Sequence, residues 1–78
     1  MTPAEIEKLI AAGLQGCSVT VLSDDNTHFE AIIVSAEFAG KRPLQRHQMV
    51  YRTLGDAVGG AIHALSIQAL TPEEHGER

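Results

Sequence analysis

The residues best suited to metal chemistry in this sequence are its histidines, and His63 is the most informative of the four. Every second residue from His63 to Ala69 forms an otherwise apolar row, and the residues between them are more polar. This period of two is typical of a strand, predicted over residues 61–69, with His63 at its beginning. Neutral imidazole is a good iron ligand, but a lone histidine beside an apolar row can also be a satisfied core or rim residue. Both interpretations are open at this point.

Three further side chains have alternative roles. His28 begins a second predicted strand and could approach His63 if the two strands are neighbours, or it could bond the backbone of the turn at residues 24–26. His47 falls on the apolar side of a predicted helix, where it either flanks the core or contacts a partner. Cys17 has no basic neighbour that would activate its thiol, so we expect a small buried hydrophobe.

Basic residues are concentrated in one segment. The net charge is −4, but Lys41, Arg42, Arg46 and Arg52 are four of the six basic residues. Such a patch can bind phosphates, an acidic protein surface or the carboxylates of glutathione. A Gly-x-x-Gly loop between two helices, with which KH domains grip nucleic acid, is missing from this region.

Carboxylates and serines offer no catalytic constellation. The pairs at residues 24–25 and 73–74 fall in turn and tail sequence, where we expect them only to improve solubility. The sequence contains neither a nucleophile elbow nor a phosphate-binding glycine motif. A non-enzymatic protein is therefore expected.

Local signals predict the elements that position these side chains. Thr2, Pro3 and Glu5 are typical of a helix start, and apolar spacing continues the helix over residues 3–14. Strands are predicted over 17–22 and 28–35, joined by a polar turn at 23–27, and a second turn is predicted at 37–40. Pro43 opens another helix, which Gly55 can divide, and residues 71–74 can start a last helical turn.

The order is therefore α-β-β-α-α-β. About 25 mostly helical residues separate the second and third strands, a length that suits a crossover and a parallel pair. We expect an α+β fold, with a three-stranded mixed sheet and helices on one face. The 78 residues form one domain with a short polar tail from about residue 73. Without a signal-peptide pattern or a long apolar run, a cytoplasmic protein that does not enter membranes is expected.

Several stretches together resemble the BolA family. They are His28-Phe29, Val34-Ser35, residues 38–51, Ile62-His63-Ala64-Leu65, and Leu70 followed by Thr-Pro-Glu-Glu. The short length is most similar to the bacterial IbaG-type branch. His75 occupies the position where many members carry tryptophan.

The resemblance implies a fold similar to the class II KH domain and a role without catalysis. BolA-like proteins pair with monothiol glutaredoxins of the CGFS type and share a [2Fe-2S] cluster with the glutaredoxin and glutathione. The resemblance implies that His63 is an iron ligand. A second ligand, Cys or His, often lies in the loop between the first two strands, but residues 23–27 contain neither, so His28 is the nearest candidate.

Docking of the glutaredoxin is expected on Phe38, Gly40, Lys41 and Arg46 together with the turn into the third strand. Some family members are described as transcriptional regulators that contact DNA through the basic helical region. That alternative assigns DNA contacts to Lys41, Arg42, Arg46 and Arg52. A homodimer of the free chain is also possible.

Overall fold

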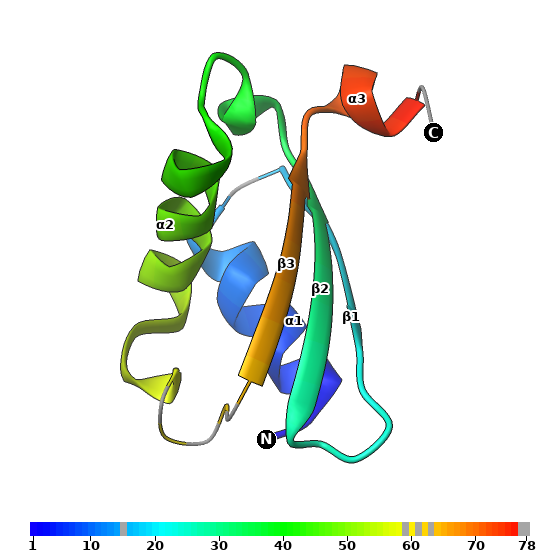
Figure 1. The fold of residues 1–78 in the computed structure, drawn as a ribbon, viewed down its shortest axis with the longest axis vertical. Helices are drawn as coiled ribbons and strands as arrows, with labels where there is room; N and C mark the ends of the chain where they lie inside the picture. The colour runs from blue at the N-terminus through cyan, green and yellow to red at the C-terminus, as the bar shows by residue number, and fades with distance from the viewer. Residues whose placement is uncertain (15, 59, 61, 63, 77–78) are drawn as a thin grey trace.

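The computed structural model describes residues 1–14, 16–58, 60, 62 and 64–76. The described residues form three strands and three α-helices, with two short 3-10 helices between them (Figure 1). The elements are α1 (Pro3–Gly13), β1 (Ser18–Leu22), β2 (His28–Val34), η1 (Ala36–Phe38), α2 (Pro43–Leu54), η2 (Gly55–Ala57), β3 (Ala64–Leu70) and α3 (Pro72–Gly76). The order agrees with the prediction as far as α2, but the second helix expected before β3 is only the 3-10 helix η2, and the third α-helix follows β3.

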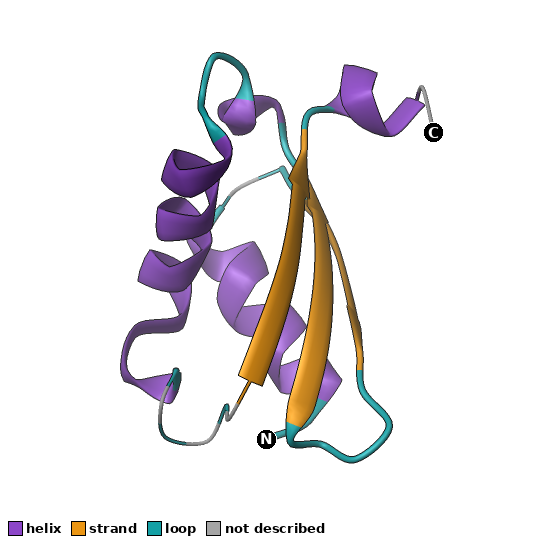
Figure 2. Cartoon of the chain, viewed as in Figure 1, coloured by secondary structure: helices purple, strands orange, loops and turns teal. Residues whose placement is uncertain are grey.

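The sheet has the strand order β1-β2-β3. β1 pairs antiparallel with β2, and β3 pairs parallel with β2 from His28 opposite Ala64 to Val34 opposite Leu70. Helices α1 and α2 pack against each other on one face of this sheet, and α3 lies beyond the end of β3 (Figure 2). The predicted α+β fold with a mixed sheet is confirmed, including the parallel pair.

The core lies between the two helices and the sheet. Phe29, Ala31 and Ile33 of β2 are buried, whereas His28 and Glu30 point to the open face and are exposed. This alternation results from the period of two along a strand. The buried apolar side chains of the described residues are Ile6, Ile10, Leu14, Val21, Phe29, Ala31, Ile33, Phe38, Val50, Leu54 and Ile62.

The helix boundaries reflect capping chemistry. Thr2 and Glu5 form the predicted capping box of α1. Gly55 ends α2 with a positive φ of 56°, which glycine adopts without a Cβ penalty, so the predicted break is confirmed. Beyond the break, the chain forms only the short turn η2. Thr71 and Glu74 bond each other's main-chain N–H groups and start α3 where a helical turn was expected.

Close contact between α1 and α2 depends on Gly13. A Cβ at this position would lie 2.8 Å from Thr53 Cβ. The two helices can therefore approach this closely only because residue 13 has no side chain. Within the described residues, no helix combines the length and the hydropathy that a membrane span requires.

Candidate functional site

The end of the sheet at which β2 and β3 begin carries His28, one of the two predicted ligands. His63 lies outside the described residues. Ala64, the next residue in the sequence, is the register partner of His28, and its N–H donates to the carbonyl of Thr27 at 3.3 Å. His28 is exposed on the open face of the sheet, beside a hollow that is also lined by Leu22, Asp24 and Ser66.

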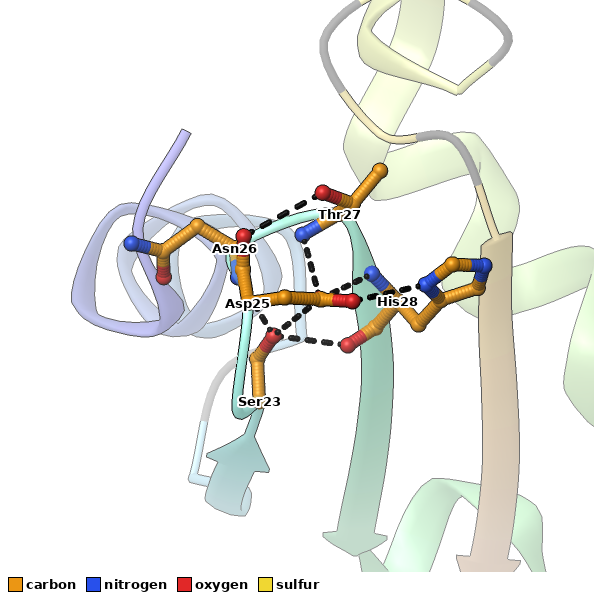
Figure 3. A network of polar contacts seen from close by, with 5 residues as sticks. All are labelled: Ser23, Asp25, Asn26, Thr27 and His28. Carbon is orange, nitrogen blue, oxygen red and sulfur yellow. Dashed lines mark hydrogen bonds and ion pairs between the residues drawn. The ribbon is translucent and has the colours of Figure 1, made fainter.

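Asp25 bonds three groups in and after the turn that precedes β2 (Figure 3). Its Oδ1 accepts hydrogen bonds from the main-chain N–H groups of Thr27 and His28, both at 2.9 Å. Its Oδ2 lies 3.0 Å from Nδ1 of the His28 ring. Ser23 closes the turn, because its hydroxyl donates to the His28 carbonyl at 2.7 Å and accepts from the Asn26 N–H at 2.9 Å.

The hydrogen bonds at Asp25 have an electrostatic consequence. Donation from the main chain and ring of His28, and then from Thr27, holds the pKa of the Asp25 carboxyl well below its ordinary range. The expectation that the 24–25 pair only improves solubility is therefore wrong for Asp25. A short side chain that bonds the main chain two and three residues ahead is typical of an Asx turn, and the Asp-Asn-Thr-His order contains that signal.

The Asp25–His28 pair has the geometry that commonly orients a metal-binding histidine. When a carboxylate accepts the Nδ1 proton, the neutral ring presents its lone pair at Nε2. His28 is bonded to the turn, as one of the two hypotheses held, but through the Asp25 side chain rather than the backbone of residues 24–26. Its predicted role as a ligand is compatible with this contact and stays a prediction.

The described residues do not form a complete metal site. No group of three or more His, Cys, Asp or Glu side chains in this part of the chain could hold a metal ion. Any cluster bound at the His28 end would therefore need thiolates from a partner.

Arg46 connects three elements at the other end of the sheet. Its Nε donates to the Lys41 carbonyl at 2.9 Å, and its Nη1 donates to the Ala69 carbonyl at 3.0 Å. Nη1 also lies 2.6 Å from Glu74 Oε1, and the guanidinium carbon is 5.9 Å from the centre of the Phe38 ring. The Arg46 side chain is only 12% exposed, so it is primarily an internal clamp.

Glu74 is the second half of this clamp. The Arg46 guanidinium and then the Thr71 N–H lower the pKa of its carboxyl. The expectation that the 73–74 pair only improves solubility is wrong for Glu74 as well. Arg46 and Glu74 are 28 positions apart, so only the fold reveals this pair.

The predicted docking residues differ in exposure. Phe38 is fully buried, because η1 directs its ring into the core, so its predicted role as a contact residue is corrected. Gly40, Lys41, Arg42 and Arg52 are exposed, and their predicted contacts are untested. The patch therefore retains three exposed basic side chains beside the largely enclosed Arg46.

The docking residues and the His28 end do not form one surface. Arg46 bonds Ala69 near the last residue of β3, whereas His28 pairs with the first. The seven residues of β2 separate these ends by about 20 Å. The predicted docking surface is thus divided between opposite ends of the sheet (Figure 1).

The remaining candidate side chains have ordinary surroundings. Cys17 is half-buried and packs against the core, and burial raises the pKa of its thiol, which fits the predicted small hydrophobe. His47 is half-buried on α2, consistent with a position at the rim of the core. His75 is exposed on α3.

Comparisons of the sequence and of the fold with known proteins identify the same family. A family model described as BolA-like protein matches residues 11–74. The structure of a bolA protein homologue from Coxiella burnetii superposes with a TM-score of 0.88 at 38% identity, covering 100% of this chain and 99% of the other.

Two curated relatives match over shorter stretches. BolA-like protein 1 from Homo sapiens is 49% identical over 51 residues, which is 65% of this chain and 37% of the relative. DNA-binding transcriptional regulator BolA from Haemophilus influenzae is 46% identical over 48 residues, 62% of this chain and 47% of the relative. The chain thus spans less than half the length of these curated relatives. On the family match and the shared fold, this chain belongs to the BolA-like protein family.

Proposed function

We propose that this protein is a non-enzymatic adaptor that docks on a CGFS monothiol glutaredoxin and shares a [2Fe-2S] cluster with it. The cluster is the cargo of the complex. His63 supplies one ligand, and His28 is the candidate for the second. The glutaredoxin and glutathione supply the thiolates, because the one cysteine of this chain, Cys17, is half-buried against the core.

The observation that best supports this role is the hydrogen bond between Asp25 and the exposed ring of His28. A carboxylate that fixes ring orientation and tautomer favours coordination through Nε2. The incomplete donor set of the described residues agrees with a shared site, because one or two imidazoles cannot hold a cluster without thiolates.

Docking in this proposal uses the His28 end of the sheet. The exposed residues there include Asp24 and Asp25 of the turn, Asp56 of η2, and Val58 just after η2. An apolar side chain with an acidic rim suits a protein surface that carries basic residues around its own cluster site. Lys41 and its neighbours are too distant to contact the same cluster.

The test is the visible absorption and circular dichroism of this chain mixed with a CGFS glutaredoxin, glutathione, iron and sulfide. A spectrum distinct from that of the glutaredoxin homodimer is expected. That difference should disappear with His63→Ala and weaken or change with His28→Ala. His75→Ala is the matched control, because His75 is exposed on α3 at the opposite end. If every sample shows only the homodimer spectrum, the adaptor role is refuted.

DNA binding is the second candidate function. It is supported by the name of the Haemophilus influenzae relative and by the exposure of Lys41, Arg42 and Arg52. Affinity should then fall steeply with salt, and the salt slope should become shallower with Lys41→Ala or Arg42→Ala. Absence of binding at low salt would remove this candidate.

A further inference from the structure

The two outer edges of the sheet are protected to different degrees. At the β1 edge, Glu7 Oε2 accepts the main-chain N–H of Val21 at 2.9 Å, and α1 packs beside the strand. A carboxylate on an edge donor prevents another strand from bonding there. The β1 edge is therefore closed to pairing at Val21, near the end of the strand.

The β3 edge has no equivalent carboxylate among the described residues. Ala64 directs its N–H to Thr27, and Leu70 accepts from Ser35 with its carbonyl, so the even-numbered residues face β2. Strand geometry then directs the main-chain groups of Leu65, Ile67 and Ala69 outward. Within the described part of the chain, no strand pairs with this edge, and Arg46 bonds it at the Ala69 carbonyl.

The sequence of β3 also favours pairing. Ala64–Leu70 contains no charged residue, no proline and no glycine. Charged residues, proline and bulges are the usual features that keep an edge strand from pairing. Leu65, Ile67 and Ala69 are only partly buried, so they can gain contacts when another strand is added.

We propose that the β3 edge is a homodimerisation surface, on which β3 of a second copy pairs antiparallel about a two-fold axis at Ile67. Ile67 would exchange two hydrogen bonds with Ile67 of the second copy, and Leu65 would exchange two with Ala69 on each side of the axis. The Ala69 carbonyl can serve as a shared acceptor, because a carbonyl oxygen has two lone pairs. The product is one continuous sheet with α1 and α2 of both copies on the same face.

The side chains and charges of a second copy are compatible with pairing at this edge. On the open face, Ser66 of one copy lies opposite Gln68 of the other, so no like charges meet. The two-fold also makes the α2 helices antiparallel. Lys41 and Arg42 at the start of one α2 are then level with Asp56 beyond the end of the other. Both the charges and the helix dipoles are complementary in this arrangement. The pairing of the strands does not require a cluster, but Asp56 also belongs to the surface proposed for glutaredoxin docking, so the two partners would compete for this residue.

Cross-linking tests the pairing and its register. In a Cys17→Ser background, chains with Ser66→Cys are mixed with differently tagged chains with Gln68→Cys and oxidised. Residues 66 and 68 form a non-hydrogen-bonded pair across the axis, about 4.5 Å apart at Cα, which a disulfide can span. The mixed cross-link should predominate, and either chain alone should give little. Equal cross-linking of the single variants would overturn this register.

Sedimentation measures the same interaction without cysteines. The mass of the unmodified protein should rise from 8.4 kDa toward twice that value as concentration increases. Ile67→Pro removes the outward N–H and should abolish this rise, since proline is tolerated on a sheet edge. Ile67→Ala, which keeps the N–H, is the matched control. A monomeric mass at all concentrations, together with no mixed cross-link, would refute the proposal, whether or not the proline variant folds.

Discussion

Replacing Arg46 should destabilise the fold, although Arg46 belongs to the segment predicted to bind partners or DNA. Arg46→Ala removes the two hydrogen bonds to the carbonyls of Lys41 and Ala69 and the contact with the Phe38 ring. It also releases Glu74, so α3 loses its connection to α2. The change therefore disconnects three elements at one end of the sheet.

The expected loss can be worked from these contacts. Two hydrogen bonds from a mostly enclosed guanidinium contribute about 1 kcal/mol each, and the cation–π contact adds roughly 0.5 kcal/mol. The exposed Glu74 carboxylate is left out, because solvent screens its charge. The free energy of unfolding should fall by about 2 to 3 kcal/mol, which lowers Tm by about 10 to 20 °C in a domain of this size.

Thermal and urea unfolding of four proteins measures this effect. Arg42→Ala is the matched control, because the Arg42 side chain is exposed and only its main-chain N–H bonds Gln45. Its free energy should change by no more than about 0.5 kcal/mol. Arg46→Lys should recover only part of the loss, since an ammonium cannot replace the guanidinium fork. If Arg46→Ala and Arg42→Ala melt together with the unmodified protein, the clamp does not contribute to stability.

Two other substitutions test the fold. Gly13→Ala should lower the free energy of unfolding by about 1 to 2 kcal/mol, because its Cβ would overlap Thr53. In a double-mutant cycle measured by urea titration, Thr53→Gly should relieve much of this cost. Additive effects of the two substitutions would contradict the close approach of the helices. Asp25 has a pKa below its ordinary 3.8 in the folded protein, so its stabilisation is present above that pH and is lost as pH falls further. Urea midpoints measured from pH 5 to pH 2 should therefore decline less steeply for Asp25→Asn, and parallel curves would contradict this assignment.

Local signals were sufficient for most of the fold. The Thr2–Glu5 spacing predicted the start of α1, and the polar residues at 23–27 predicted the turn between β1 and β2. Both depend on contacts within a few residues, which a sequence records directly. The parallel pairing of β3 with β2 was predictable from connection length and chain handedness. The predicted boundaries differed by a residue or so, except at the start of β3, where residues 61 and 63 are not described.

Side-chain roles were harder to predict where the partner is distant in sequence. The sequence places Arg46 and Lys41 in the same basic segment and does not distinguish their roles. In the fold, Arg46 donates hydrogen bonds to the Ala69 carbonyl and the Glu74 carboxylate. The burial of Phe38 depends on how η1 turns after β2, which composition does not encode. Asp25 could have been identified, because its contacts lie within three residues.

The length of β2 affects whether the protein can bind two partners at the same time. The seven residues of β2 separate the two ends of the sheet by about 20 Å, so one globular domain at the His28 end and a polyanion at the Lys41–Arg42 end need not overlap. A ternary complex is then sterically allowed, and the two candidate activities need not compete. Single substitutions of exposed side chains at either end should therefore leave binding at the opposite end intact.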